Sequence, residues 1–430
     1  MNEIGLTTGL KPAKNLDEIW TIFDPTLTMD PRTEFYIERT APELQKLFFE
    51  LKHSNHNMHA FLCGHRGSGK TTELNRLCLD KEIRDKYTPI YMTARTFGSE
   101  TVHLTHDAIL LEIGLELVRQ GKPLGLSPKY KKELENWGKD VVKTYLKDKS
   151  ARAEVGAKAG LWLAFFKAQL SSRREWKQEE KLILEPKVQD LLGILNRIGQ
   201  DLKNRSDKQL LVMVDDLEKG ESDAHRVMHS RLFQENYDIL VQPRFSIVYT
   251  LPVYFRGLPD SRIPNDQLYA FSAIRLYEKK DKHLDKPPLS VNQKGYQLMK
   301  AFVNKRLQEP GNIFEEGVLD ELLRIGGGLF RETARAVREA VYLALTEKKE
   351  RIGKDHALKV YHQVKKEYQP IIRGDAIQVL KEVMECSQGW VSGVEPFLQS
   401  RAVVEYENND LWLDLRYALK SYIRELSPNK

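Results

Sequence analysis

Residues 61–77, FLCGHRGSGKTTELNRL, decide the fold of this chain. The stretch begins with an apolar run, places three glycines within six residues, and ends in a pattern typical of a helix. Residues 64–71 match G-x-x-x-x-G-K-[ST]. Glycines let a loop wrap closely around a phosphate with its backbone N–H groups, because side chains would block that approach. The sequence therefore predicts a phosphate-binding loop between a strand and a helix.

The cofactors expected here are ATP, or ADP after turnover, and Mg²⁺. Lys70 should reach the β- and γ-phosphates, and the Thr71 hydroxyl should ligate Mg²⁺. The helix that starts near Lys70 adds the positive end of its dipole. The predicted nucleotide-binding residues of this loop are Gly64, His65, Arg66, Gly67, Ser68, Gly69, Lys70, Thr71 and Thr72.

A second element of the site is expected in LLVMVDDLEKG, residues 210–220, where acidic residues follow a buried strand. Asp215 should hold Mg²⁺ through water, and Asp216 should orient or deprotonate the attacking water. Glu218 competes with Asp216 for that role. The alternative is that the Asp-Asp pair caps a helix N-terminus.

A third strand, within SIVYTLP, residues 246–252, ends at Thr250. Its hydroxyl should sit between the glycine-rich and acidic loops and could contact the γ-phosphate. The alternative is an ordinary β-forming threonine. Together these features predict a triphosphate and its metal held at neighbouring strand ends.

The wider pattern indicates an α/β fold. Between residues 59 and 280, short apolar runs alternate with longer helical patterns, as in a parallel sheet covered by helices. The predicted parts are an N-terminal segment (1–50), a P-loop ATPase core (51–285) with a helical insertion at about 122–190, a helical lid (286–370) and a C-terminal domain (371–430).

The C-terminal domain shows two helical patterns and then two alternating segments around Asn408, a hairpin signal. This order resembles a winged-helix fold. The hairpin carries Glu405, Glu407, Asp410 and Asp414 against Arg401 and Arg416, and duplex DNA would repel that sign of charge. We therefore expect it to contact protein or the ATPase core.

The insertion is the better nucleic-acid candidate. Residues 123–181 carry 14 lysines and arginines against 8 acidic residues. Lysines 129, 131, 132, 139 and 143 are interleaved there with Tyr130 and Trp137. A solvated helical face is the alternative for the whole basic segment, residues 129–181.

Composition bounds the class of protein. The chain has 430 residues, a net charge of +6 and three cysteines without paired spacing, which argues against a disulfide framework or a zinc site. No apolar run approaches the roughly 18 residues that a membrane span needs. A cytoplasmic protein without membrane contact is the expectation.

With these residues, the chain resembles the AAA+ superfamily over about residues 30–425, and within it the STAND-like and initiator-like ATPases. The acidic motif VDDLEK also resembles that of KAP-type P-loop NTPases. The resemblance makes Thr250 a sensor-1 residue and, through IGGGLFRETARAVREA at 325–340, makes Arg331 a sensor-2-like lid residue. Arg39 in FYIER matches an adenine-side segment, F-h-G-R, in which Glu38 replaces the glycine.

The resemblance also implies a trans-acting arginine after sensor 1, for which Arg256 and Arg262 are candidates, and hence a homo-oligomer. An Asp-Asp pair where AAA+ motors have Asp-Glu implies slow hydrolysis, which suits a switch. Such switches act on partner proteins in bacterial signalling and antiphage defence. The alternative function is a DNA-associated initiator, loader or transposition-type ATPase, and a scaffold without turnover is a weaker one.

Overall fold

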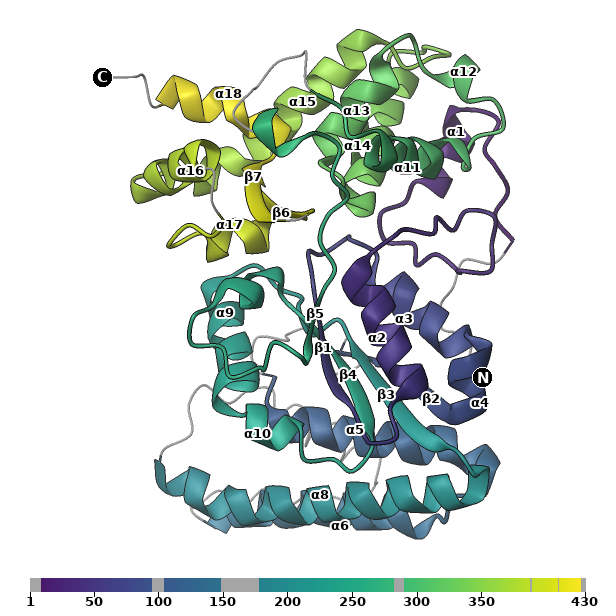
Figure 1. Ribbon diagram of the computed structural model, residues 1–430, viewed down its shortest axis with the longest axis vertical. Coiled ribbons are helices and arrows are strands. Elements are labelled where there is room, and N and C mark those ends of the chain that lie inside the picture. Colours follow the sequence, from purple (N-terminus) through teal and green to yellow (C-terminus); the bar gives the residue numbers. More distant parts are fainter. Residues whose placement is uncertain are drawn as a thin grey trace.

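The computed structural model describes residues 9–94, 104–147, 178–281, 290–386, 389–408 and 410–426 (Figure 1). Its core is a five-stranded parallel sheet with the order β2-β3-β4-β1-β5. The strands are β1 (His59–Cys63), β2 (Tyr87–Thr93), β3 (Gln209–Asp215), β4 (Ser246–Leu251) and β5 (Leu268–Ala270). The predicted α/β class with a parallel sheet is confirmed.

Successive residues of the central strands point to opposite faces of the sheet, and both faces are buried, as in other parallel sheets. Ala60, Leu62 and Met213 pack under α2 (Pro42–His53), α3 (Lys70–Leu79) and α4 (Lys81–Lys86). Phe61 and Val214 face the other side. The helices there are α5 (His106–Gly121), α9 (Asp223–Ser230) and α10 (Tyr237–Leu240).

The strand order decides which loops meet. β4 lies between β1 and β3, with Cys63 opposite Leu251 and Val214 opposite Tyr249. The glycine-rich and acidic loops therefore leave the same edge of the sheet but are not on adjacent strands, which corrects the expectation of neighbouring strand ends. Thr250 lies in the strand between them, which ends one residue later than expected, at Leu251.

The insertion forms two long helices, α6 (Lys129–Lys147) and α8 (Gln178–Ser206), which run beside each other along the bottom of Figure 1. Tyr130 and Trp137 are buried in the core between α5, α6 and α8, and the Trp137 indole donates to the Lys187 carbonyl. The expectation that these aromatics are interleaved with lysines for nucleic-acid contact is therefore wrong for both. Residues 148–177 of the basic segment, and the Lys143 side chain, lie outside what the structure describes.

The helical lid follows the sheet domain and packs around its own core. It contains α11 (Gln293–Asn304), α12 (Pro310–Ile313), α13 (Val318–Gly326), α14 (Phe330–Thr346) and α15 (Lys354–Tyr368). Helix α1 (Leu16–Ile22) buries Ile19 and Ile22 in this lid core, whereas α2 packs on the sheet. The N-terminal segment is thus divided between the two bodies.

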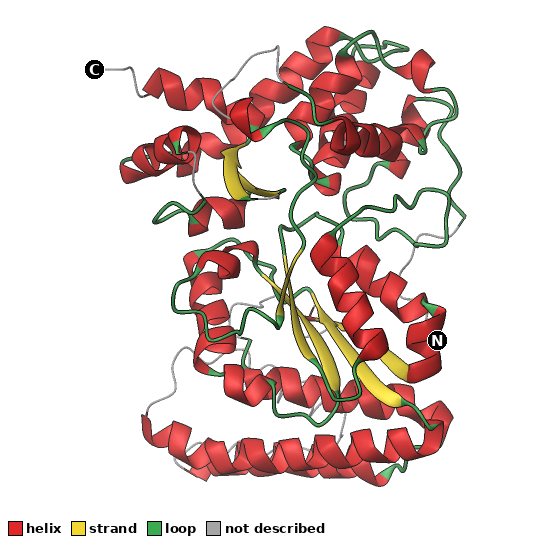
Figure 2. Cartoon of the chain, in the orientation of Figure 1, coloured by secondary structure: helices red, strands yellow, loops and turns green. Residues whose placement is uncertain are grey.

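The C-terminal domain consists of α16 (Asp375–Glu385), α17 (Glu395–Ser400), the antiparallel hairpin β6 (Val403–Glu407) and β7 (Leu411–Leu415), and α18 (Tyr417–Leu426). Figure 2 shows this small hairpin above the main sheet. Tyr406 faces Trp412 across it, with stacked rings 4.8 Å apart. Short helical turns are η3 (Lys122–Leu124), η4 (Arg231–Glu235), η5 (Val253–Gly257), η6 (Lys279–Asp281) and η7 (Gln369–Ile371). Among the described helices, none combines the length and apolar character needed to cross a bilayer.

Candidate nucleotide-binding site

The glycine-rich loop has the backbone that its sequence predicts. Gly67 and Gly69 have φ angles of 86° and 106°, in the left-handed region that favours glycine, and α3 begins at Lys70. Gly67 also lies against the lid, since a Cβ added there would be 2.5 Å from the Arg331 Cβ. The loop therefore needs glycine both for its conformation and for its contact with α14.

Lys70 is buried at the base of the loop. Its Nζ donates to the carbonyls of Gly64 (2.8 Å) and His65 (3.0 Å) and forms an ion pair with Glu218 Oε1 at 3.0 Å. The structure thus connects the glycine-rich loop directly to the acidic loop through one ammonium group. A phosphate placed in the loop would compete with Glu218 for it.

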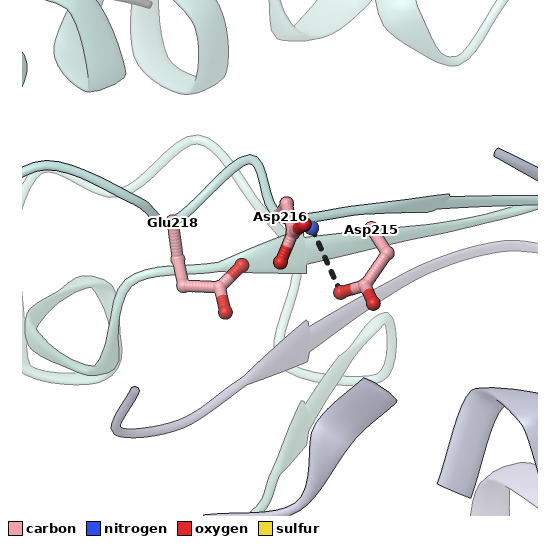
Figure 3. A group of neighbouring side chains, drawn as sticks. All are labelled: Asp215, Asp216 and Glu218. Atoms are coloured by element: carbon pink, nitrogen blue, oxygen red, sulfur yellow. Dashed lines mark hydrogen bonds between the residues drawn. The ribbon is translucent and has the colours of Figure 1, made fainter. Parts of the chain in front are cut away.

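Three carboxylates gather at the end of β3 (Figure 3). One oxygen each of Asp215, Asp216 and Glu218 lies within 4.8 Å of the others. Asp215 is fully buried and accepts from the Tyr91 hydroxyl (2.7 Å) and from the Asp216 backbone N–H (2.7 Å). Burial, and then the negative charges of Asp216 and Glu218, raise the pKa of Asp215 to about 6. Such a group favours a divalent cation, which offsets the repulsion.

Asp216 turns the chain away from the strand. Its φ of 68° is left-handed, a conformation that aspartate tolerates better than most residues. Its carboxylate accepts from Thr93 Oγ1 (2.7 Å) and pairs with Lys219 (2.6 Å). The predicted alternative, an N-cap, is not formed, since α9 starts at Asp223 and its N-cap is Ser222.

Thr250 is completely buried, and its hydroxyl accepts from the Leu217 backbone N–H at 3.1 Å. It therefore braces the acidic loop from within the sheet. It is not among the residues that line the cavity, so a direct γ-phosphate contact is not what this conformation presents.

Arg331 stands in the first turn of α14 and lines the cavity beside Arg66 and Glu218. Its backbone N–H donates to the Gly67 carbonyl (3.3 Å), and its Nε donates to the Pro25 carbonyl (3.1 Å). Burial, and then the positive charge of Arg66, lower its pKa. The lid thus places a cation over the glycine-rich loop.

The cavity extends from the loop to a mostly apolar end that sequence reasoning missed. Its lining there comes from the N-terminal segment and the lid, and Tyr36 at its edge donates to Glu73 of α3 (3.0 Å). No motif marks these residues, and only the lid and the N-terminal segment folding together creates the wall. The apolar lining residues are Ile22, Leu27, Met29, Phe35, Ile37, Phe302 and Phe330, and the cationic Arg306 lines the cavity with them.

Arg39 does not line this cavity. Its guanidinium lies 4.1 Å from the Phe271 ring centroid and donates to the carbonyls of Ser68 (3.3 Å) and Ser272 (2.6 Å). Through these two hydrogen bonds Arg39 connects the glycine-rich loop to the segment that follows β5. Its neighbours Tyr36 and Ile37 line the cavity.

His65 also points away from the cavity. Its Nε2 accepts from the backbone N–H of Glu405 in β6 at 2.8 Å. Burial, and then the charges of Lys70 and Arg401, lower the pKa of His65 to about 3, so the ring is neutral. The His65 side chain is therefore a contact between the loop and the C-terminal hairpin.

Arg256 is not a surface arginine. Its Nη1 pairs with Glu405 (3.0 Å) and Glu407 (2.9 Å) of the same chain. Glu405 is 1% exposed, so this ion pair is held inside the contact between sheet domain and hairpin. In this conformation Arg256 is engaged by carboxylates of its own chain, and the trans role expected for it stays a prediction. Arg262 remains half exposed and pairs with Asp238.

The residues present fit a triphosphate with a divalent cation. Ser68 Oγ in the loop and Glu218 Oε2 in the acidic group are buried and have no hydrogen-bond partner within the described chain. Unsatisfied buried polar atoms are costly. Glu218 also lines the cavity, so a hydrated cation or a water there would satisfy its Oε2. Asp215, with Thr71 beside it, would hold Mg²⁺.

Comparison with known proteins finds similarity among solved structures only. No protein-family model matches the sequence, and no curated protein matches it. Similar solved structures include Cdc6p from Pyrobaculum aerophilum, with 12% identity and a TM-score of 0.35 over 95% of this chain and 98% of that chain. ORC2 from Aeropyrum pernix, in ADPNP–ADP complexes, has 12% identity and a TM-score of 0.37 over 92% and 96%.

The Holliday junction branch migration motor RuvB from Thermotoga maritima has 10% identity and a TM-score of 0.33 over 96% and 97%. The assignment rests on this chain's own strand order, glycine-rich loop and acidic strand end. The chain has a P-loop NTPase fold.

Proposed function

We propose that the protein is an AAA+-like ATPase that binds Mg-ATP and hydrolyses it slowly as a switch. The observation that carries this proposal is the convergence of three parts on one cavity. These are the glycine-rich loop, the acidic end of β3 and Arg331 of the lid. A cation on the lid and a carboxylate at a strand end are what phosphoryl transfer requires around its phosphates.

The ion pair between Lys70 and Glu218 gives the proposed site a built-in exchange. When Lys70 turns to a phosphate, Glu218 loses its partner and becomes free to accept a proton or orient a water. Asp216, already paired with Lys219, is then the weaker candidate for the base. Bound Mg²⁺ would supply neutralisation of phosphate charge, with Thr71 and Asp215 as its protein ligands.

The contacts of the C-terminal domain support a switch rather than a simple hydrolase. His65 of the glycine-rich loop holds β6. Glu332, next to Arg331, is buried and pairs with Arg416 (2.6 Å) and Arg401 (3.2 Å), both from the C-terminal domain. One domain therefore contacts both phosphate-facing elements, and a change at either would alter its docking.

We further propose that release of this domain exposes a surface for self-association and for a partner chain. The resemblance to AAA+ and STAND-like ATPases implies that such a switch would act in signalling or antiphage defence. The DNA-associated alternative depends on the basic insertion.

Calorimetry with Mg-ATP tests the binding site. Wild-type protein should bind, and Lys70→Ala should lower the affinity at least a hundredfold, because the P-loop ammonium is lost. No heat from the wild type at millimolar Mg-ATP would end the proposal.

Sizing by light scattering, with and without a non-hydrolysable ATP analogue and duplex DNA, separates the two functions. The switch predicts assembly with the analogue alone. The alternative predicts salt-dependent assembly only with DNA, which is lost when lysines 129, 131, 132, 139 and 143 are neutralised.

A further inference from the structure

Arg306 is a buried cation that lines the cavity. It follows α11, is 4% exposed, and donates through Nη1 to the carbonyls of Phe302 (2.6 Å) and Phe35 (3.4 Å). Within the described chain, no carboxylate lies at ion-pair distance from it. Burial alone lowers its pKa to about 9. Burying a charge is costly unless it is paired, so a guanidinium kept here calls for an explanation.

The position of Arg306 relative to the glycine-rich loop is defined by two aromatic rings. The Phe330 ring lies 3.5 Å from a Cβ built at Gly69, and its centroid is 5.0 Å from that of Phe302. The Arg306 guanidinium in turn lies 3.9 Å from the Phe302 centroid. Arg306 therefore lines the same cavity as Gly69 and is separated from it by the rings of Phe302 and Phe330.

We propose that Arg306 recognises the nucleoside end of the bound nucleotide, by donating hydrogen bonds to acceptor atoms of the base or the ribose. This inference rests on the proposed function. A guanidinium has five N–H donors, and the two carbonyls engage only Nη1, so donors remain for a ligand. The surrounding wall is apolar, and the donors of Arg306 would therefore fix the orientation of the ring that enters it.

Nearby Lys305 provides a matched control. Its Nζ donates to the Tyr36 carbonyl (3.0 Å), next to the Phe35 carbonyl that Arg306 contacts, but Lys305 is exposed and does not line the cavity. Both side chains tie the lid to the N-terminal segment, and only Arg306 presents donors to the cavity. Lys305→Met therefore removes the tie without removing the proposed recognition.

The experiment measures the affinities of Mg-ATP and of magnesium tripolyphosphate by calorimetry, for wild type, Arg306→Met, Arg306→Lys and Lys305→Met. Tripolyphosphate reports on the phosphate end alone. Arg306→Met should bind ATP about 10- to 100-fold more weakly, the scale of a charge-assisted hydrogen bond, and tripolyphosphate within twofold of wild type. Arg306→Lys should lose less, since it keeps the charge. Lys305→Met should match wild type for both probes.

Unchanged ATP affinity in Arg306→Met, or an equal loss for both probes, would overturn the inference. If Arg306→Met does not fold, Arg306→Lys decides, because loss of the planar fork should weaken ATP but leave tripolyphosphate unchanged. A wild type that binds tripolyphosphate as tightly as ATP also contradicts the inference and leaves the phosphate site standing. A wild type that binds neither probe contradicts the proposed function itself.

Discussion

At the residue scale, Lys70 and Glu218 are the pair on which the site depends. Their ion pair at 3.0 Å is almost completely buried, with side-chain exposures of 3% and 7%. A buried pair is weak evidence of stabilisation as such, but removing one partner leaves a charge without compensation. The free energy of unfolding therefore reports on the charge compensation between Lys70 and Glu218, whereas ATP affinity reports on the Lys70 ammonium group itself.

Lys70→Met should lower the free energy of unfolding by about 3 kcal/mol, because Glu218 is left buried and unpaired. The double variant Lys70→Met, Glu218→Gln should recover most of that loss, yet still fail to bind ATP. Urea denaturation and calorimetry measure the two effects. Equal stability of the single and double variants would contradict the importance of the ion pair.

The neutral His65 ring makes stability depend on pH. Its pKa is about 3 in the folded protein and near 6.5 when unfolded, so the unfolded chain takes up a proton first as the pH falls. The stability that the neutral His65 ring contributes to the fold is fully present above pH 6.5 and is lost as the pH falls towards 3.

At pH 5 the penalty amounts to up to about 2 kcal/mol. The variant His65→Gln keeps an acceptor for the Glu405 backbone N–H. Its melting temperature should fall less than that of wild type when the pH is lowered from 7.5 to 5. His229 is also buried, with its pKa lowered to about 4, but it affects both proteins alike. Parallel pH curves for the two proteins would contradict the assignment.

At the scale of elements, the contact between the glycine-rich loop and α14 couples the lid to the phosphate site. Gly67 has a left-handed φ and touches Arg331, whereas Gly317, at the start of α13, has a φ of 81° and nothing within 4 Å of an added Cβ. The two glycines share the backbone conformation and differ in their surroundings. They form a matched pair for separating strain from packing.

Gly317→Ala should cost about 1 kcal/mol from backbone strain alone. Gly67→Ala should cost about 3 kcal/mol, because its methyl group also displaces Arg331, and it should abolish ATP binding. Thermal melts and calorimetry on both variants provide the comparison. The coupling is refuted if Gly67→Ala binds ATP normally.

At the scale of the whole molecule, the C-terminal domain closes onto the sheet domain through both charge and apolar packing. Phe255 of η5 and Leu398 of α17 belong to one continuous hydrophobic cluster. Arg256 forms ion pairs with both Glu405 and Glu407 in this contact. The acidic hairpin thus has its cationic partner within its own chain.

Arg256→Met should release the hairpin, since Glu405 would be buried without a cation, at a cost of about 3 kcal/mol. Hydrogen exchange along β6 should rise at least tenfold. Arg262→Met is the control, because that ion pair is half exposed and contributes about 0–1 kcal/mol.

A trans-acting Arg256 predicts a different outcome. ATPase activity would return when Arg256→Met is mixed with Lys70→Ala, and β6 would stay protected.

What the sequence determined is local. The glycine-rich loop, Lys70 and the acidic end of β3 were predictable because contiguous residues of special backbone freedom and charge specify a phosphate site within one strand–loop–helix unit. The alternation of short apolar runs with helical patterns likewise predicted the parallel sheet, because strands that are buried on both faces must be continuously apolar.

Only the tertiary structure decided which distant charges meet. Arg256 and Glu405 are separated by 149 positions, and His65 and Glu405 by 340. Such partners cannot be read from spacing, because a surface arginine and a buried, paired one are alike in sequence. Arg306 is the same case. Its burial, with no carboxylate of the described residues at ion-pair distance, appears only when the end of α11 and the N-terminal segment pack around it, since burial depends on the whole packing.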